Sequence, residues 1–138
     1  IGGSMGGASA LTFAALHPEM VDGVTALNGL ANHLEYENFQ DFIAESFGGP
    51  KDKIPEEYKK RSAEFHAEKL VMPTALTVSG DDTVVPPESV VRLAEKLRVL
   101  GREVMLTDRP DGGHATNYGD AMAAMEFMLA SADKKLRN

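Results

Sequence analysis

The 138-residue sequence contains no cysteine. This absence excludes disulfide bonds, thiolate metal sites and a cysteine nucleophile. A cytosolic protein and a secreted bacterial protein can both lack cysteine, so the compartment stays open. No apolar run approaches the roughly 18 residues of a membrane-spanning helix, and the chain does not open with a segment typical of a signal peptide.

Positive charge is also scarce. The sequence has 14 Lys and Arg residues against 21 Asp and Glu residues, a net charge of −7. Nucleic-acid-binding proteins usually carry a basic patch, and anionic membrane surfaces repel acidic proteins. We therefore expect neither a nucleic acid nor a membrane as a partner. A hydrophobic share of 43% and a charged share of 25% are ordinary for a soluble protein, and the length favours a single domain.

Apolar runs of strand length alternate with stretches of helical periodicity, which predicts an α/β fold with a parallel sheet flanked by helices. The predicted strands are Val21–Leu27, Thr74–Val78 and Glu103–Thr107; the predicted helices are Ala8–Leu16, Ala31–Phe47, Glu88–Leu100 with Gly101 as its cap, and Asn117–Ala130, while Pro55–Leu70 is predicted as helical in pieces. Residues 29–70 form the one long excursion between strands, and such an excursion lies beyond the strand ends, where ligands bind.

Residues 2–7 read Gly-Gly-Ser-Met-Gly-Gly and contain the pattern Gly-x-Ser-x-Gly. In an α/β-hydrolase this pattern builds a sharp strand-to-helix turn with the serine at its apex in a strained conformation, and the glycines leave room where a Cβ would clash. Ser4 is then the candidate nucleophile, and the backbone N–H of Met5 faces the developing oxyanion. The alternative is a glycine-rich loop that caps the next helix or cradles a phosphate. The sequence does not complete the Walker or the dinucleotide-binding pattern.

A serine nucleophile needs a histidine base, and the histidine needs an orienting carboxylate. The loop after the predicted strand Thr74–Val78 contains Asp81 and Asp82, and the loop after Glu103–Thr107 contains His114. This chain order of serine, acid and histidine is that of the α/β-hydrolases, and both loops follow carboxyl ends of strands. The same residues have simpler interpretations, since an Asp pair forms turns and a histidine can cap a helix.

Three other histidines compete with His114 for the role of base. His17 follows a predicted helix next to a proline, and His66 stands in a charged helical stretch, so both are interpreted as structural. His33 belongs to the excursion, from which it can approach the substrate.

These patterns resemble the C-terminal half of α/β-hydrolases, in the branch of prolyl-oligopeptidase-like peptidases, acetyl-xylan-type esterases and dienelactone-hydrolase-like enzymes. The resemblance covers nearly the whole chain and is carried by the Gly-Gly-Ser-Met-Gly-Gly turn, the sequence Gly80-Asp-Asp-Thr-Val-Val-Pro86, the pair Gly113-His114 and the stretch from Pro55 to Pro73. In the family's loop the acid precedes Val-Pro by three residues, so the resemblance selects Asp82 over Asp81.

The sequence departs from this family at its start. The family has several strands before the nucleophile turn, and one of them carries the second oxyanion donor, whereas this chain begins at Ile1, next to the turn itself. We expect residues 1–138 to form a single partial domain whose N-terminal strands are absent from this chain. The strand at Val21–Leu27 is expected to lack neighbours and to leave a sheet edge open. We expect such a piece to be completed by the missing N-terminal half or by self-association.

The resemblance implies a serine hydrolase that acts on a small-molecule ester through an acyl-enzyme, with Ser4, Asp82 and His114 as the triad and Met5 N–H as an oxyanion donor. It implies no metal and no organic cofactor. A prolyl-oligopeptidase-like peptidase is the first alternative. A hydrolase-derived binding module without turnover is the second, and the intact triad argues against it.

Overall fold

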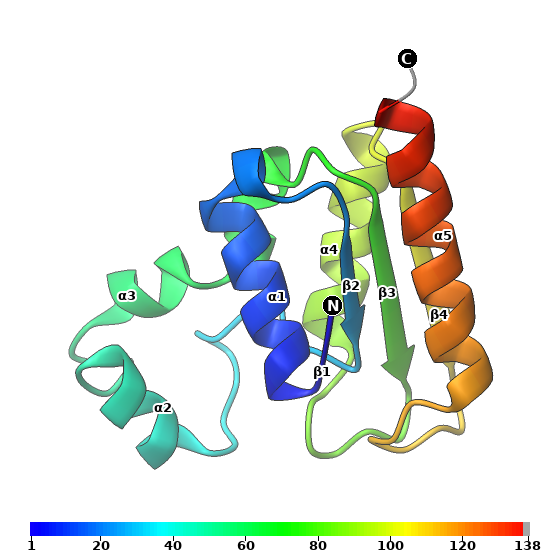
Figure 1. Ribbon diagram of the computed structural model, residues 1–138. Coiled ribbons are helices and arrows are strands. Elements are labelled where there is room, and N and C mark those ends of the chain that lie inside the picture. Colours follow the sequence, from blue (N-terminus) through cyan, green and yellow to red (C-terminus); the bar gives the residue numbers. More distant parts are fainter. Residues whose placement is uncertain (137–138) are drawn as a thin grey trace.

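The computed structural model describes residues 1–136 as an α/β protein. Four parallel strands form one sheet, in the order β1 (Gly2–Gly3), β2 (Val24–Leu27), β3 (Thr74–Ser79) and β4 (Val104–Arg109). Every neighbour in the sheet is also the next strand in sequence, so each connection returns the chain through a helical segment (Figure 1). Because all strands are parallel, their carboxyl ends meet at one edge, and the loops that follow them share that edge.

Within the described residues, four α-helices and two 3₁₀ helices lie in the connections between strands, and a fifth α-helix follows β4. These are α1 (Met5–Leu16), η1 (Pro18–Met20), α2 (Gln40–Phe47), α3 (Pro55–Lys60), η2 (Ala63–Lys69), α4 (Glu88–Val99) and α5 (Tyr118–Leu136). Among the helices of residues 1–136, none combines the length and the apolar character needed to cross a membrane. The strand and helix predictions are confirmed for most elements, with shifted ends, and α5 runs further than the predicted Asn117–Ala130.

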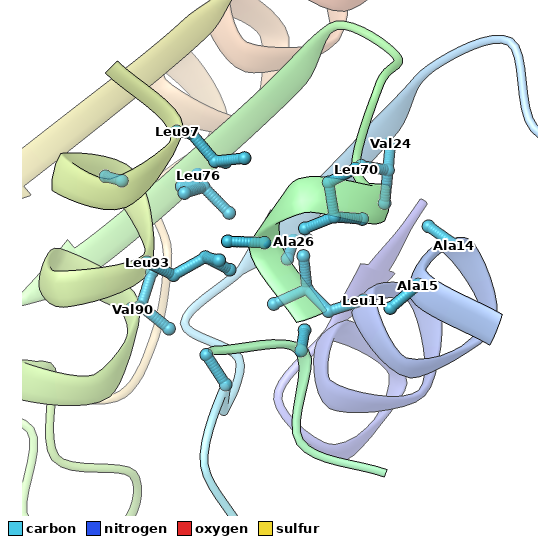
Figure 2. Close-up of a cluster of buried hydrophobic side chains, with 14 of the residues drawn as sticks. Leu11, Ala14, Ala15, Val24, Ala26, Leu70, Leu76, Val90, Leu93 and Leu97 are labelled. Carbon is cyan, nitrogen blue, oxygen red and sulfur yellow. The ribbon is translucent and has the colours of Figure 1, made fainter. Parts of the chain in front are cut away.

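The main core lies on one face of the sheet, between the strands and α1, η2 and α4. Its buried side chains include the following residues, all labelled in Figure 2: Leu11, Ala14, Ala15, Val24, Ala26, Leu70, Leu76, Val90, Leu93 and Leu97. In β2 and β3 the core residues alternate with residues of the opposite face, as the two-residue period of a strand requires. α5 contacts β2, β3 and β4 and covers that opposite face (Figure 1).

The predicted helix Ala31–Phe47 is wrong over its first half. Only α2 is α-helical there, and residues 31–39 form turns. Polar side chains bind the backbone locally in this segment: Asn32 Oδ1 accepts the N–H of Leu34, and Gln40 Nε2 donates to the carbonyl of Tyr36. Such side-chain bonds compete with helical hydrogen bonds, which explains why the apolar periodicity was misleading.

The expected open edge at Val21–Leu27 is also misplaced. β2 begins only at Val24 and has a neighbour on each side, because Gly2 pairs with Ala26 and Val24 pairs with Thr74. The two edge strands are β1 and β4, and each pairs on one side only within the described residues. The strand that leads into the Ser4 turn therefore forms one of the two borders of this sheet.

Gly2 is the glycine that the β1–α1 turn requires. A Cβ at Gly2 would lie 2.0 Å from the carbonyl oxygen of Gly6, whereas a Cβ at Gly3 would meet nothing closer than the carbonyl oxygen of Leu27 at 3.8 Å. At Gly6 a Cβ would have nothing within 4 Å. The sequence predicts that the glycines of this turn stand where a Cβ would clash. This prediction is confirmed for Gly2 and, among the described residues, is wrong for Gly6.

Replacing Gly2 by alanine should destabilise the protein, because α1 must move away from β1 to admit the methyl group. We expect Gly2→Ala to lower the free energy of unfolding by about 1–3 kcal/mol, the usual cost of overpacking, and Gly3→Ala to change it by less than about 0.5 kcal/mol. Denaturant titrations of both variants and the wild-type protein measure this. Equal stability of the two variants would contradict the close approach of Gly2 and Gly6.

His33 is buried in the excursion and packs away from solvent. Its ring packs edge-on against that of Phe47 with centroids 5.2 Å apart, and its Nδ1 has no hydrogen-bond partner among the described residues. Burial, aided by the positive charge of Arg61, lowers the pKa of His33 from 6.5 to about 4. The folded protein therefore holds His33 neutral at pH values where the unfolded chain protonates it.

This lowered pKa predicts a pH dependence of stability. Between pH 6.5 and about pH 4 the unfolded state binds the extra proton, so stability contributed by His33 is complete above pH 6.5, falls as the pH falls, and levels off below about pH 4. The fall amounts to about 3 kcal/mol. Denaturant titrations across this range should show a smaller fall for His33→Leu than for the wild-type protein. Parallel curves for the two proteins would show that His33 titrates normally.

Candidate active site

Ser4 stands alone between β1 and α1 in a backbone conformation that a non-glycine residue rarely adopts. Its φ is 53° and its ψ is −120°. Such a conformation costs about 1–3 kcal/mol and persists only where the surroundings impose it. Here the N–H of Ser4 donates to the carbonyl of Leu27 at 2.8 Å, and the carbonyl of Ser4 accepts the N–H of Ala8 at 3.0 Å. β2 and the first turn of α1 thus hold the serine from its two sides, as the turn motif predicts.

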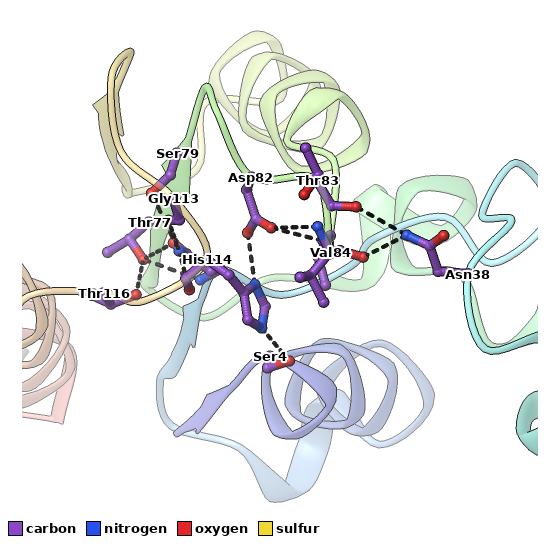
Figure 3. A network of polar contacts seen from close by, with 12 residues as sticks. Ser4, Asn38, Thr77, Ser79, Asp82, Thr83, Val84, Gly113, His114 and Thr116 are labelled. Carbon is purple, nitrogen blue, oxygen red and sulfur yellow. Dashed lines mark hydrogen bonds and ion pairs between the residues drawn. The ribbon is translucent and has the colours of Figure 1, made fainter.

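His114 connects two of the predicted site residues across the carboxyl edge of the sheet. Its Nε2 lies 2.8 Å from Ser4 Oγ, and its Nδ1 lies 2.8 Å from Asp82 Oδ2. These residues are 110 and 32 positions from His114 in sequence. Figure 3 shows the three side chains in line, with the imidazole between the carboxylate and the hydroxyl. The structure brings together the three residues that the sequence singles out.

Asp82 is the carboxylate in contact with His114, and its neighbour is not. Asp82 is 4% exposed, and its Oδ1 accepts the N–H groups of Val84 and Val85, both at 2.9 Å. These two bonds fix the plane of the carboxylate and leave Oδ2 for the imidazole. Asp81 is exposed, and its backbone N–H donates to the carbonyl of Gly112. The geometry agrees with the spacing to Val-Pro that selects Asp82.

The acid loop, residues 80–87, packs directly on the base loop, residues 110–117. The N–H of Gly80 donates to the carbonyl of Arg109 at 2.8 Å, and that of Asp81 to the carbonyl of Gly112 at 3.0 Å. A Cβ at Gly80 would lie 2.3 Å from the carbonyl oxygen of Pro110. These contacts set the distance between the two loops, and through it the distance between Asp82 and His114.

The excursion also contacts the acid loop, through two residues that the sequence did not single out. Tyr36 OH donates to the carbonyl of Val84 at 2.8 Å, and Asn38 Nδ2 donates to the carbonyls of Thr83 and Val84 at 3.1 and 3.0 Å. Burial and the nearby Asp82 carboxylate raise the pKa of Tyr36, although its hydrogen bond with Asn38 acts against them. Tyr36 therefore stays a proton donor at neutral pH. The sequence holds no local signal for these contacts, since they join segments about 46 positions apart.

Met5 is the first residue of α1, directly after Ser4. The N–H groups of a first helical turn have no acceptor within the helix, and the helix dipole makes this end partly positive. An anion that forms beside Ser4 therefore faces donors that are free to bind it. Ser9, the next serine in the sequence, lies inside α1, and its hydroxyl donates to the carbonyl of Met5.

The other histidines do not contact the Ser4 site. His17 ends α1, with its ring 5.0 Å from that of Phe13, and His66 lies within η2. His33 packs on Phe47, as described above. Within residues 1–136, no three His, Asp or Glu side chains gather in a way that could hold a metal ion.

Several solved structures resemble this fold. A puromycin hydrolase matches with a TM-score of 0.72 and 22% identity over 98% of this chain and 20% of its own. The dipeptidyl peptidase 4 of Porphyromonas gingivalis matches with a TM-score of 0.79 and 18% identity, over 94% of this chain and 19% of its own. The monoacylglycerol lipase of Paleococcus ferrophilus matches with a TM-score of 0.60 and 21% identity, over 96% of this chain and 66% of its own. Identities this low show the fold alone.

The chain thus spans about a fifth of the length of the first two of these enzymes. A comparison with curated protein sequences found no significant match. The model of the prolyl oligopeptidase family, in contrast, matches residues 1–137. Because this match covers nearly the whole sequence, and the sheet has the corresponding architecture, the chain belongs to the prolyl oligopeptidase family and has an α/β-hydrolase fold.

Proposed function

We propose that this chain carries the catalytic triad of a serine hydrolase, with Ser4 as nucleophile, His114 as general base and Asp82 as the acid that orients it. The observation that carries the proposal is the continuous chain of hydrogen bonds from Asp82 Oδ2 through the imidazole to Ser4 Oγ. A serine hydroxyl is a weak nucleophile without a base in hydrogen-bond contact, and 2.8 Å is within that reach.

The reaction follows from this geometry. His114 Nε2 takes the hydroxyl proton while Ser4 Oγ attacks the substrate carbonyl, and Asp82 stabilises the imidazolium that forms. The N–H of Met5 stabilises the oxyanion of the tetrahedral intermediate. His114 then gives its proton to the leaving group, and the bond between the carbonyl carbon and that group breaks. Water enters, loses a proton to His114 and attacks the carbonyl carbon of the acyl-enzyme. The bond from that carbon to Ser4 Oγ then breaks, His114 returns the proton to Ser4 Oγ, and the acid is released.

A carboxylic ester is the first substrate class that we propose. The leaving alcohol of an ester departs more readily than the amine of a peptide, so an ester makes the smaller demand on the oxyanion site. Met5 N–H is the one oxyanion donor that the family motif identifies in this chain. A small-molecule ester or acylated compound therefore suits the groups described here best.

A peptide is the second candidate, and the family match favours it. The matching model is that of the prolyl oligopeptidase family, and the solved relatives include a dipeptidyl peptidase. The same triad cleaves amides when the oxyanion is held firmly enough.

We further propose that the second oxyanion donor comes from outside residues 1–138, either from another segment of the protein or from a second copy. In the part of the chain that the structure describes, β1 pairs on one side only, and α1 exposes Met5 and Phe13, which are 81% and 46% accessible. An unpaired parallel strand next to exposed apolar side chains is a surface that another strand and its flanking residues can cover.

Ser4→Ala tests the function and its two substrate classes together. We expect the full-length protein to hydrolyse p-nitrophenyl acetate and the Ser4→Ala variant to lose this activity by at least about 10³-fold, because no base-activated hydroxyl remains. Ser9→Ala is the matched control and should keep the wild-type rate. The same assay with an aminoacyl p-nitroanilide separates the classes: serine-dependent release of nitroaniline assigns a peptidase, and ester turnover without it assigns an esterase. Undiminished ester turnover in Ser4→Ala would refute the nucleophile.

The two neighbouring aspartates offer a matched pair for the acid. Asp82→Asn should lower kcat for the ester by about 10⁴-fold, because an amide at this position favours the wrong tautomer of the imidazole. Asp81→Asn should keep kcat within a few fold, since the Asp81 side chain is exposed and only its backbone joins the loops. Steady-state kinetics of both variants decide the matter, and a larger loss for Asp81→Asn would reverse the assignment.

A further inference from the structure

Asn28 is a buried polar residue at the carboxyl end of β2, and neither the sequence motifs nor the reaction described above uses it. It directly follows Leu27, is 3% exposed and has a φ of 45°. Asparagine is one of the few residues besides glycine that adopt this left-handed conformation readily. The backbone requirement explains why a small polar residue stands here but does not explain what its amide does.

The amide of Asn28 binds the backbone of the base loop. Its Nδ2 donates to the carbonyl of His114 at 2.7 Å, and lies 3.3 Å from the carbonyl of Gly113 and 3.2 Å from Ser79 Oγ. The shortest of these contacts goes to the residue that carries the base. Asn28 thereby holds the backbone carbonyl of His114, while Ser4 and Asp82 contact its imidazole (Figure 3).

Thr77 sets the orientation of this amide. Thr77 Oγ1 donates to Asn28 Oδ1 at 3.0 Å, so the oxygen of the amide faces β3 and the nitrogen faces His114. The backbone N–H of Asn28 also points at Thr77, with its carbonyl at 3.0 Å and its hydroxyl at 3.1 Å. A flipped amide would place Oδ1 against the carbonyl oxygens of the base loop and would leave both without a donor.

We propose that Asn28 is a positioning residue that holds the backbone of His114 so that its imidazole meets Ser4 and Asp82 together. The inference rests on the proposed function, because it concerns the base of that reaction. The base loop belongs to the segment between β4 and α5, and the bond from Asn28 ties it to β2, the strand that also holds the N–H of Ser4. One strand end thus sets the positions of both the base and the nucleophile.

Two substitutions separate the amide from the backbone conformation. Asn28→Gly keeps the left-handed backbone and removes the amide. Asn28→Asp has nearly the same shape, but it replaces the donor by an oxygen that faces the His114 carbonyl. Ser79→Ala is the matched control, because it removes another buried partner of Nδ2 and leaves the bond to His114 in place.

The test measures ester kcat and KM, together with the rate of labelling by a fluorophosphonate probe, for the full-length protein and the three variants. A misplacement of about 1 Å can cost 10²-fold in rate, so we expect kcat and the labelling rate to fall about 10- to 100-fold in Asn28→Gly and Asn28→Asp, with KM within twofold. Ser79→Ala should keep kcat within about twofold of the wild-type value. Circular dichroism and denaturant titration verify that each variant is folded.

The outcomes separate this inference from the proposed function. Wild-type labelling at Ser4, together with an unchanged kcat in Asn28→Gly, would overturn the role of Asn28 alone. Equal losses in Asn28→Gly and Ser79→Ala would also overturn it, because they would reveal a general weakening of the loops. A wild-type protein that the probe does not label would overturn the proposed function, and this inference with it.

Discussion

The imidazole of His114 must meet a hydroxyl on one side and a carboxylate on the other, and the surrounding structure is arranged around that double requirement. The two partners come from different loops, one after β1 and one after β3, and His114 itself follows β4. Parallel strands make this possible because their carboxyl ends lie at one edge. The register of the sheet therefore decides whether the three side chains meet, since a slipped strand would carry its loop along the edge.

Two residues at this edge have strained backbone conformations, and hydrogen bonds to the neighbouring strands stabilise both. Ser4 and Asn28 both have positive φ values, and they end neighbouring strands. Each is held by hydrogen bonds to the next strand: the N–H of Ser4 to Leu27, and the N–H of Asn28 to Thr77. The pairing of β1 with β2 and of β2 with β3 thus continues one residue beyond the strands and stabilises two unfavourable conformations. The buried core beneath them, between the sheet and α1, η2 and α4, keeps the strands in place.

Part of this arrangement follows from local sequence, and part does not. Ser4, Asp82 and His114 could be identified because Ser4 stands in a Gly-x-Ser-x-Gly pattern, Asp82 and His114 follow predicted apolar strands, and the chain order of the three residues matches one reaction. The helix predicted from residue 31 failed because Asn32 and Gln40 bind nearby backbone groups, a competition that apolar periodicity does not register. The supporting residues Asn28, Tyr36 and Asn38 act over about 46 to 86 positions, so only the folded structure reveals their partners.

The proposed reaction depends on the activation of Ser4 by His114. The most direct measurement is to treat the full-length protein with a fluorophosphonate, digest it and locate the adduct by mass spectrometry. We expect a single adduct on the peptide that contains Ser4, formed in the native protein and absent after denaturation, because an unfolded serine has no base beside it. An adduct on another serine of the native protein, or equal labelling of the native and denatured protein, would contradict it.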